Sequence, residues 1–381
     1  MYEALEDGRI NMAHIRAIWV EVLLATQAES DLIWIAVDSS NISRPDARTS
    51  ADRTVIHLPN LPLVENAISV GWTFSTVVLI PEQTSRWTPL LDQQRITSTQ
   101  TAIAVAIAQL QALRPLFGNR RVIILADRWY GMAEFLRACQ TPGYSVLIRL
   151  KSNRKLYRVP VRVHRRGAPP KDGPLFQGKS PQTHGVADEV SAEQDQTGRT
   201  TRISAWNHLH FQQDRELELR VIRVEREAAT GTKRDPRVSW FVMLDAVIPL
   251  SQVAQHYGRR FSQEHGYRFL KQHLLWTRVH VRTPEQFERW SWVLVLVFNQ
   301  LYLVRACGQA LHRPWERTDR PVTPQQVRRV MPTILWQVGT PARRCQPRGK
   351  SPGRPKGFQP EPAPRFPVVW KTPKQPQKAT G

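Results

Sequence analysis

The sequence has few cysteines and no apolar segment long enough to span a bilayer. Its three cysteines, Cys139, Cys307 and Cys345, lie far apart in a chain of 381 residues. This spacing excludes a disulfide framework and a CxxC pair of metal ligands, and it fits a reducing compartment. The longest apolar run, residues 292–304, is shorter than a membrane-spanning helix. The acidic N-terminus also lacks the apolar region of a signal peptide.

Several common catalytic motifs are missing as well. No GxSxG occurs, so a serine hydrolase is unsupported. Residues 173–180 match the letters of a P-loop, but no buried strand precedes them and Pro181 disfavours a helix starting at Ser180. ATP binding is therefore not predicted. The histidines near the centre of the chain do not have the spacing of a zinc pair: His256, His265, His273 and His280.

The charge balance, by contrast, is strongly basic. Lys and Arg number 54 against 32 Asp and Glu, which gives a formal net charge of +22 at pH 7. Nucleic acid is the first partner to consider for such a chain. From residue 341 on, Pro, Arg, Lys and Gly predominate, and we expect a disordered basic tail. This tail either adds salt-sensitive DNA affinity or serves only to keep the protein soluble.

Two acidic residues stand at the carboxyl ends of apolar strands. The run from Asp31 leads into Asp38, and the run from Arg121 leads into Asp127. In open α/β sheets this edge binds ligands, and carboxylates there can share a hard cation. Each acid taken alone is as well explained by a cap on a turn.

A third acid lies on a stretch that reads as one helix, residues 256–272. One carboxylate and several cationic or hydroxyl groups share a stripe of this helix: Tyr257, Arg260, Glu264, Arg268 and Lys271. Two interpretations are open. The stripe is either a salt-bridged surface or a metal ligand surrounded by phosphate-binding groups. The two strand-end acids favour the second.

The spacing Tyr-x2-Arg-x3-Glu-x6-Lys, from Tyr257 to Lys271, resembles the signature of insertion-sequence DDE transposases. Residues 36–40 (Ala-Val-Asp-Ser-Ser) resemble the strand that carries the first Asp of that family. Residues 125–131 (Leu-Ala-Asp-Arg-Trp-Tyr-Gly) resemble the strand that carries the second. The resemblance extends over residues 31–305.

The resemblance implies roles for individual residues. Asp38, Asp127 and Glu264 would be the catalytic acids and would bind two Mg²⁺ ions, for which Mn²⁺ substitutes. Tyr257, Arg260 and Lys271 would contact DNA phosphates. Two tryptophans are candidates by position for stacking a displaced base, although packing in the core is the alternative for both: Trp129 and Trp240.

It also implies an α/β fold, an RNase H-like mixed sheet flanked by helices, with a β-rich insertion between the second Asp and the Glu helix. The expected divisions are an N-terminal helical remnant, a catalytic domain in two pieces, the insertion, a C-terminal helical segment and the basic Pro-rich disordered tail. Their bounds are residues 1–30, 31–151 with 237–306, 152–236, 307–340 and 341–381.

The implied function is a transposase that cleaves DNA and transfers strands by metal-dependent phosphoryl transfer. Its partners would be transposon ends and target DNA, held by a homodimer, at the nucleoid in a bacterial cytoplasm and not at a membrane. Family members usually carry a helical DNA-binding region before the first Asp, whereas here only the short segment 1–30 precedes that strand. The alternatives are a truncated, non-catalytic DNA-binding remnant and a cellular nuclease on the same fold.

Overall fold

The fold of this chain is described by a computed structural model. It describes residues 2–27, 31–58, 67–81, 85–161, 170–194, 200–227, 238–245, 248–311, 313–317, 319–339, 349, 353, 355–359 and 361–371. Most of the predicted basic tail lies outside these residues. The helices α1 (Tyr2–Asp7) and α2 (Met12–Ala25) precede the first strand.

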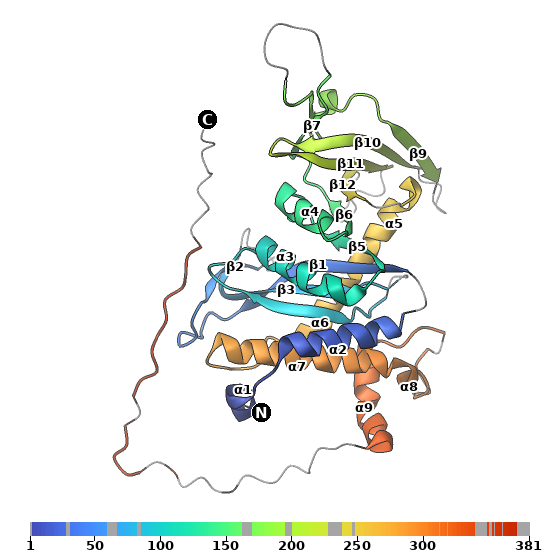
Figure 1. Ribbon diagram of the computed structural model, residues 1–381. Coiled ribbons are helices and arrows are strands. Elements are labelled where there is room, and N and C mark those ends of the chain that lie inside the picture. Colours follow the sequence, from blue (N-terminus) through green and yellow to red (C-terminus); the bar gives the residue numbers. More distant parts are fainter. Residues whose placement is uncertain are drawn as a thin grey trace.

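Five strands and two connecting helices form the centre of the molecule (Figure 1). Strand β1 pairs antiparallel with β3 and parallel with β5, and β5 continues parallel to β6. Strand β4 pairs antiparallel with the other side of β3. The bounds of these elements are β1 (Leu32–Ser43), β3 (Ile68–Leu79), β4 (Leu90–Ile96), α3 (Ala102–Leu113), β5 (Arg121–Ala126), α4 (Ala133–Gln140) and β6 (Ser145–Arg149).

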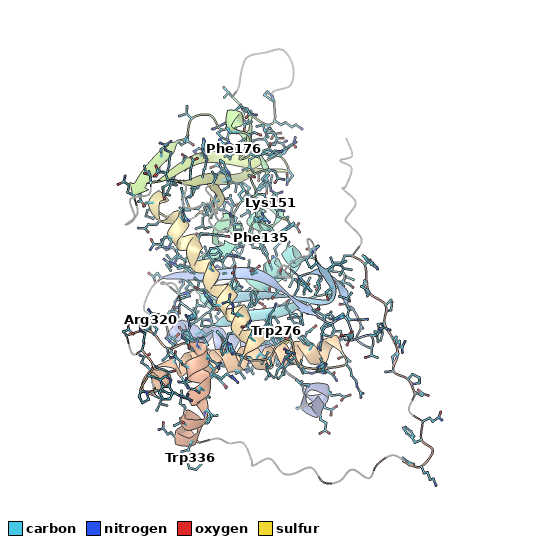
Figure 2. The ribbon with its side chains drawn as sticks, turned by 180° about the vertical axis from the view of Figure 1, so that it is seen from behind. Phe135, Lys151, Phe176, Trp276, Arg320 and Trp336 are labelled. Carbon is cyan, nitrogen blue, oxygen red and sulfur yellow. The ribbon has the colours of Figure 1, made fainter. Side chains whose placement is uncertain are left out.

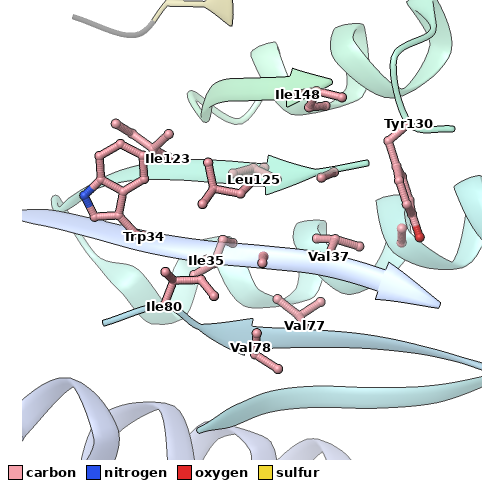
Figure 3. Close-up of a cluster of buried hydrophobic side chains, with 14 of the residues drawn as sticks. Trp34, Ile35, Val37, Val77, Val78, Ile80, Ile123, Leu125, Tyr130 and Ile148 are labelled. Carbon is pink, nitrogen blue, oxygen red and sulfur yellow. The ribbon is translucent and has the colours of Figure 1, made fainter. Parts of the chain in front are cut away.

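The predicted parallel neighbours are therefore β1, β5 and β6. The buried face of this sheet is aliphatic, and Figure 3 shows Ile35, Val37 and Leu125 packed between the strands. The short strand β2 (Thr54–His57) pairs with the start of β3. The sequence does not predict β2, because its four residues are too few to show an alternation of apolar and polar side chains.

The sheet continues beyond β6 without interruption. Strand β12 (Val238–Leu244) pairs with β6, and β11, β10, β7 and β8 follow in that order, with β9 beside β10. Figure 1 shows these strands above the central ones. The residues between 152 and 236 thus add their strands to the central sheet through β12. Their bounds are β7 (Lys155–Arg158), β8 (Leu175–Gln177), β9 (Glu189–Gln194), β10 (Thr200–Phe211) and β11 (Asp214–Arg226).

Helices cover both faces of the central strands. Adjacent residues of a strand point to opposite faces. The hydroxyl of Ser75 on β3 donates to Gln109 of α3 at 2.6 Å, which places α3 on one face. The neighbouring Phe74 packs against Phe287 of α7 (Pro284–Leu303), which places α7 on the other. Asp38 pairs in register with Thr76, so it shares the face of Phe74.

The predicted helix 256–272 is divided in two. Helix α5 (Val253–Gly258) ends in the 3-10 turn η4 (Arg259–Phe261), and α6 (Ser262–Gln272) follows. Figure 2 shows helices α5 and α6, which follow one another, crossing the central strands. In a 3-10 turn, residues three positions apart lie on the same side. Tyr257 and Arg260 therefore share one side of the helix, and that side is buried. These two side chains are buried, whereas Glu264 and Arg268 are exposed, so the single stripe expected from a regular helix is wrong.

The chain ends on helices and an extended segment. Helices α8 (Arg305–Gln309) and α9 (Pro324–Val338) follow α7. Residues 361–371 then run along the edge of β2, where Arg53 donates to the carbonyl of Phe366 at 3.0 Å and Val369 forms a bridge with Thr54. This part of the tail is therefore docked, in contrast to the expected solvated tail. No helix in the described ranges is both long and apolar enough to cross a membrane.

Candidate active site

Asp38 stands on β1 where that strand leaves the buried part of the sheet. Its Oδ2 accepts a hydrogen bond from Nη2 of Arg260 at 2.8 Å, and its Oδ1 accepts one from the backbone N–H of Ser39 at 2.8 Å. The side chain keeps 20% of its accessible surface and that of Arg260 keeps 9%. The pair is therefore largely removed from water, and the guanidinium holds the carboxylate in one orientation.

The electrostatic surroundings of Asp38 disfavour its charge. Burial raises the pKa of this carboxyl from 3.8 to about 6, although Arg260 pulls it down. The value of about 6 already includes like-charge repulsion from Asp127 and Glu264, which raises the pKa. The three predicted acids thus act on one another, and a strongly perturbed carboxyl in a cavity is typical of a functional site.

Asp127 follows β5 directly and begins a tight turn. Its Oδ1 accepts a hydrogen bond from the backbone N–H of Trp129 at 2.8 Å, and its carbonyl accepts one from the N–H of Tyr130 at 3.1 Å. The turn fixes the carboxylate beside the parallel neighbour β1. The turn-capping interpretation therefore holds for one oxygen of Asp127, and it does not exclude a ligand at the other.

Glu264 lies on the first turn of α6 and is exposed. It forms no salt bridge with any side chain in the described ranges. Within those same ranges, no three His, Cys, Asp or Glu side chains converge closely enough to hold a metal ion. The predicted triad is therefore a set of electrostatic neighbours and not a closed metal cage.

The predicted phosphate-binding residues point inward. Tyr257 is buried and its ring packs edge-on against Phe241 of β12 at 4.9 Å between centroids. Burial raises the pKa of its hydroxyl. Nζ of Lys271 donates to the carbonyl of Asn41 at 3.0 Å, and burial lowers the pKa of this ammonium. In this structure Arg260 and Lys271 tie the helix to the end of β1.

The two candidate tryptophans have different environments. Trp129 is 60% exposed, and the ammonium of Lys151 lies 3.4 Å from its ring centroid. Trp240 is only 5% exposed and packs with Phe176, Trp206 and His184 among the strands added by the insertion. The core-packing alternative is therefore correct for Trp240, because a buried ring cannot receive a base without unfolding its surroundings.

Two tyrosines near Asp38 were not among the predicted site residues. The hydroxyl of Tyr267 donates to the backbone carbonyl of Asp38 at 3.1 Å. The hydroxyl of Tyr130 is buried and has no hydrogen-bond partner within the described part of the chain. Figure 3 shows the Tyr130 ring beside the carboxyl-terminal part of β1. The sequence offered one indication of this role. Tyr130 lies three residues after Asp127, and the turn between them brings Tyr130 back to the same edge of the sheet.

Asp38, Asp127, Trp129 and Tyr130 border a cavity of about 810 Å³, whose lining does not include Glu264. Asp38 and Asp127 contribute to one wall, and the amino end of α3 contributes to another. The part of its lining that bears on catalysis is Asp38, Asn41, Asp127, Arg128, Trp129 and Tyr130.

In the described ranges the three acids do not converge closely enough to enclose a divalent cation, although their chemistry suits one. Carboxylate oxygens are the ligands that Mg²⁺ prefers. The repulsion that raises the Asp38 pKa is what a cation between the acids would relieve. The unpartnered Tyr130 hydroxyl supplies a donor for a water or a phosphate oxygen nearby.

A family of known proteins matches this chain. Residues 1–210 match the model described as DDE superfamily endonuclease, which is more than half of the sequence. The match includes Asp38 and Asp127 and ends before Glu264. No curated protein matches the sequence.

Proposed function

Because this chain belongs to the DDE superfamily endonucleases, we propose that it is an insertion-sequence transposase that cuts and joins DNA at Asp38, Asp127 and Glu264. The single observation that carries the proposal is the placement of Asp38 and Asp127 in the wall of one cavity, with Arg260 holding the Asp38 carboxylate at 2.8 Å. Phosphoryl transfer requires positioned charges more than a covalent nucleophile, and this arrangement supplies them.

The topology supports an RNase H-like assignment. The spatial order β4-β3-β1-β5-β6, with three antiparallel strands followed by two parallel neighbours, is a mixed sheet of the kind that the resemblance implied. The residues from 152 to 236 then form the insertion between the second acid and the helix with the third. The spacing from Tyr257 to Lys271 supports the subgroup with the Tyr-Arg-Glu-Lys signature.

Asp38, Asp127 and Glu264 are the residues that would hold two Mg²⁺ or Mn²⁺ ions. Bound ions supply charge neutralisation at the phosphorus and a more acidic attacking oxygen. The protein's own groups orient the reaction. Arg260 fixes the Asp38 carboxylate, and Tyr267 fixes the backbone of the same residue. The hydroxyl of Tyr130 donates to an oxygen of the phosphate group or to the attacking water.

The reaction balances without a covalent enzyme intermediate. Water attacks the phosphorus of a phosphodiester, the P–O3′ bond breaks, and the strand leaves as a 3′-hydroxyl that takes up a proton. That hydroxyl then attacks a phosphodiester of target DNA, a new P–O bond forms and the target's own 3′-oxygen leaves. Trp129 at the cavity wall stacks a base displaced near the cut. A homodimer on paired ends would let both ends react together.

The test is cation-dependent cleavage and strand transfer on DNA that carries the ends flanking the gene. Asp127→Asn and Glu264→Gln should each abolish both activities. Glu134→Gln is the matched control, because Glu134 is an exposed acid on the helix that follows Asp127. Activity that survives either active-site substitution contradicts the triad.

The same assay separates the alternatives. A cellular nuclease would cleave the DNA without joining ends, and the products would show no strand transfer. A non-catalytic remnant would bind DNA without cleaving it, and its binding would be indifferent to Asp127→Asn.

A further inference from the structure

A second cavity, of about 610 Å³, lies beside α6 and away from the cavity that contains Asp38. It is formed by three segments that are distant in sequence: the residues before β4, the start of α6 and the loop between α8 and α9. We name it the arginine pocket after its most prominent lining residues, which are Arg86, Trp87, His265, Glu316, Arg317 and Arg320. Figure 2 shows Arg320 on the loop that leads into α9.

The charge of this pocket is positive. Three guanidinium groups and one imidazole face a single carboxylate, that of Glu316. Glu316 is already engaged, because Nη1 and Nη2 of Arg329 donate to its two oxygens at 2.8 and 2.7 Å. In the described ranges Arg86, Arg317 and Arg320 form no salt bridge. Within the part of the chain that the structure describes, these three arginines therefore have no carboxylate partner.

The fold holds these cations in place. The indole N–H of Trp87 donates to the carbonyl of Val322 at 2.8 Å, across 235 residues, and this bond is buried. It joins the segment with Arg86 to the loop with Arg317 and Arg320. Gly266 of α6 approaches the same segment so closely that a Cβ there would lie 2.4 Å from Oγ1 of Thr88. The backbones around the pocket are therefore fixed even though its arginine side chains are exposed.

The pocket adjoins the candidate active site along α6. His265, one of its lining residues, directly follows Glu264 in the chain. Successive phosphates along one strand of duplex DNA are about 3.4 Å apart on the helix axis. A DNA strand that passes Glu264 and continues along α6 would bring further phosphates toward His265 and the pocket.

We infer that the arginine pocket binds a backbone phosphate of DNA a few nucleotides from the cleaved bond. Arginine forks match phosphate oxygens in bidentate geometry, and Trp87 provides a rigid floor. The pocket positions the strand and carries no sequence readout, since phosphate contacts fix register alone. The inference rests on the proposed function, because it assumes that DNA lies across Glu264.

The test measures DNA affinity against salt concentration, without divalent cations so that no cleavage occurs. The variant replaces Arg86, Arg317 and Arg320 with Gln. The control replaces Arg9, Arg121 and Arg328 with Gln, which removes the same charge from exposed sites outside the pocket. Thermal unfolding of both variants should match that of the unmodified protein, because all six side chains are exposed.

The slope of log affinity against log salt should fall by about one for the pocket variant, the contribution of about one phosphate contact. The slope of the control should change by much less. Coincident curves for the two variants would overturn the inference. If the pocket variant proves unstable, Arg320→Lys alone is compared with Arg328→Lys, and equal DNA affinity of these two proteins overturns the inference as well.

Competition with inorganic phosphate tests whether the pocket binds a free anion or a phosphate of a DNA strand. At matched ionic strength, phosphate should compete with DNA in the unmodified protein and lose that effect in the pocket variant. Loss of phosphate binding with an unchanged DNA slope would mean that the pocket takes a free anion, which contradicts the inference. Because these readouts are binding only, they are independent of whether Asp127→Asn abolishes cleavage.

Discussion

Arg260 donates a hydrogen bond from Nη2 to Oδ2 of Asp38 at 2.8 Å, although the two residues are 222 positions apart in the chain. This contact joins the turn between α5 and α6 to the carboxyl end of β1. It makes Arg260 a residue that positions the proposed catalytic acid Asp38.

Arg260→Gln should lower activity and shift its pH dependence. The guanidinium lowers the Asp38 pKa, so its removal should raise that pKa further above about 6. The carboxylate form would then be reached only at higher pH, and the acidic limb of the cleavage profile should move the same way. Loss of one partner of a largely buried pair should also destabilise the fold by about 3 kcal/mol.

The measurements are the pH–rate profile and the carboxyl titration of Asp38 by NMR in metal-free protein. Arg268→Gln serves as the control, because Arg268 is an exposed arginine of the same helix. An unshifted acidic limb would mean that Arg260 acts on DNA and not on Asp38.

Lys271→Ala tests whether this lysine is structural. Removing the ammonium leaves the Asn41 carbonyl without the donor that ties α6 to β1. The free energy of unfolding should fall by about 2 kcal/mol, the usual effect for a hydrogen bond to a charged group. Arg268→Ala should change it by less than about 0.5 kcal/mol. Denaturant unfolding decides, and a stable Lys271→Ala protein with weakened DNA binding would restore the phosphate role expected from the signature.

Tyr130→Phe should separate catalysis from stability. The buried Tyr130 hydroxyl has no partner in the described ranges, so its removal should leave the melting temperature unchanged or higher. If it donates to the reacting phosphate or water, cleavage should slow on the order of 10²-fold.

Tyr144→Phe is the matched control. The Tyr144 hydroxyl donates to the carbonyl of Leu110 at 2.7 Å in the core, away from the cavity. This change should cost about 1 kcal/mol of stability and leave the cleavage rate unaltered. Equal cleavage rates for both variants would remove Tyr130 from the site.

Two glycines on the α5–α6 rod should respond to alanine with opposite signs. A Cβ at Gly266 meets buried Thr88, so Gly266→Ala should destabilise the protein by about 1–3 kcal/mol and move the arginine pocket. A Cβ at Gly258 meets nothing within 4 Å, so Gly258→Ala should stabilise it by about 0.5–1 kcal/mol. Calorimetry on both variants measures the change in stability. Changes of the same sign would contradict the close packing of α6 against the segment before β4.

The sequence by itself determined the local elements that carry strong periodic signals. The apolar runs before Asp38 and Asp127 predicted β1 and β5, because a strand buried on both faces must be apolar throughout. Asp127 directly follows β5 as expected, whereas the expectation that Asp38 ends its strand is wrong, since β1 continues to Ser43. The charge balance and the spacing from Tyr257 to Lys271 pointed to DNA chemistry before any geometry was known.

Only the tertiary structure decided which side chains face the site. A 3-10 turn at Arg259–Phe261 interrupts the helix, and Arg260 is buried against Asp38 while Glu264 remains exposed. The arginine pocket depends on a hydrogen bond between Trp87 and Val322 that no local pattern encodes. The physical reason is the same in both cases: periodicity reports the average burial of a segment, whereas contacts between distant segments depend on how the whole chain packs.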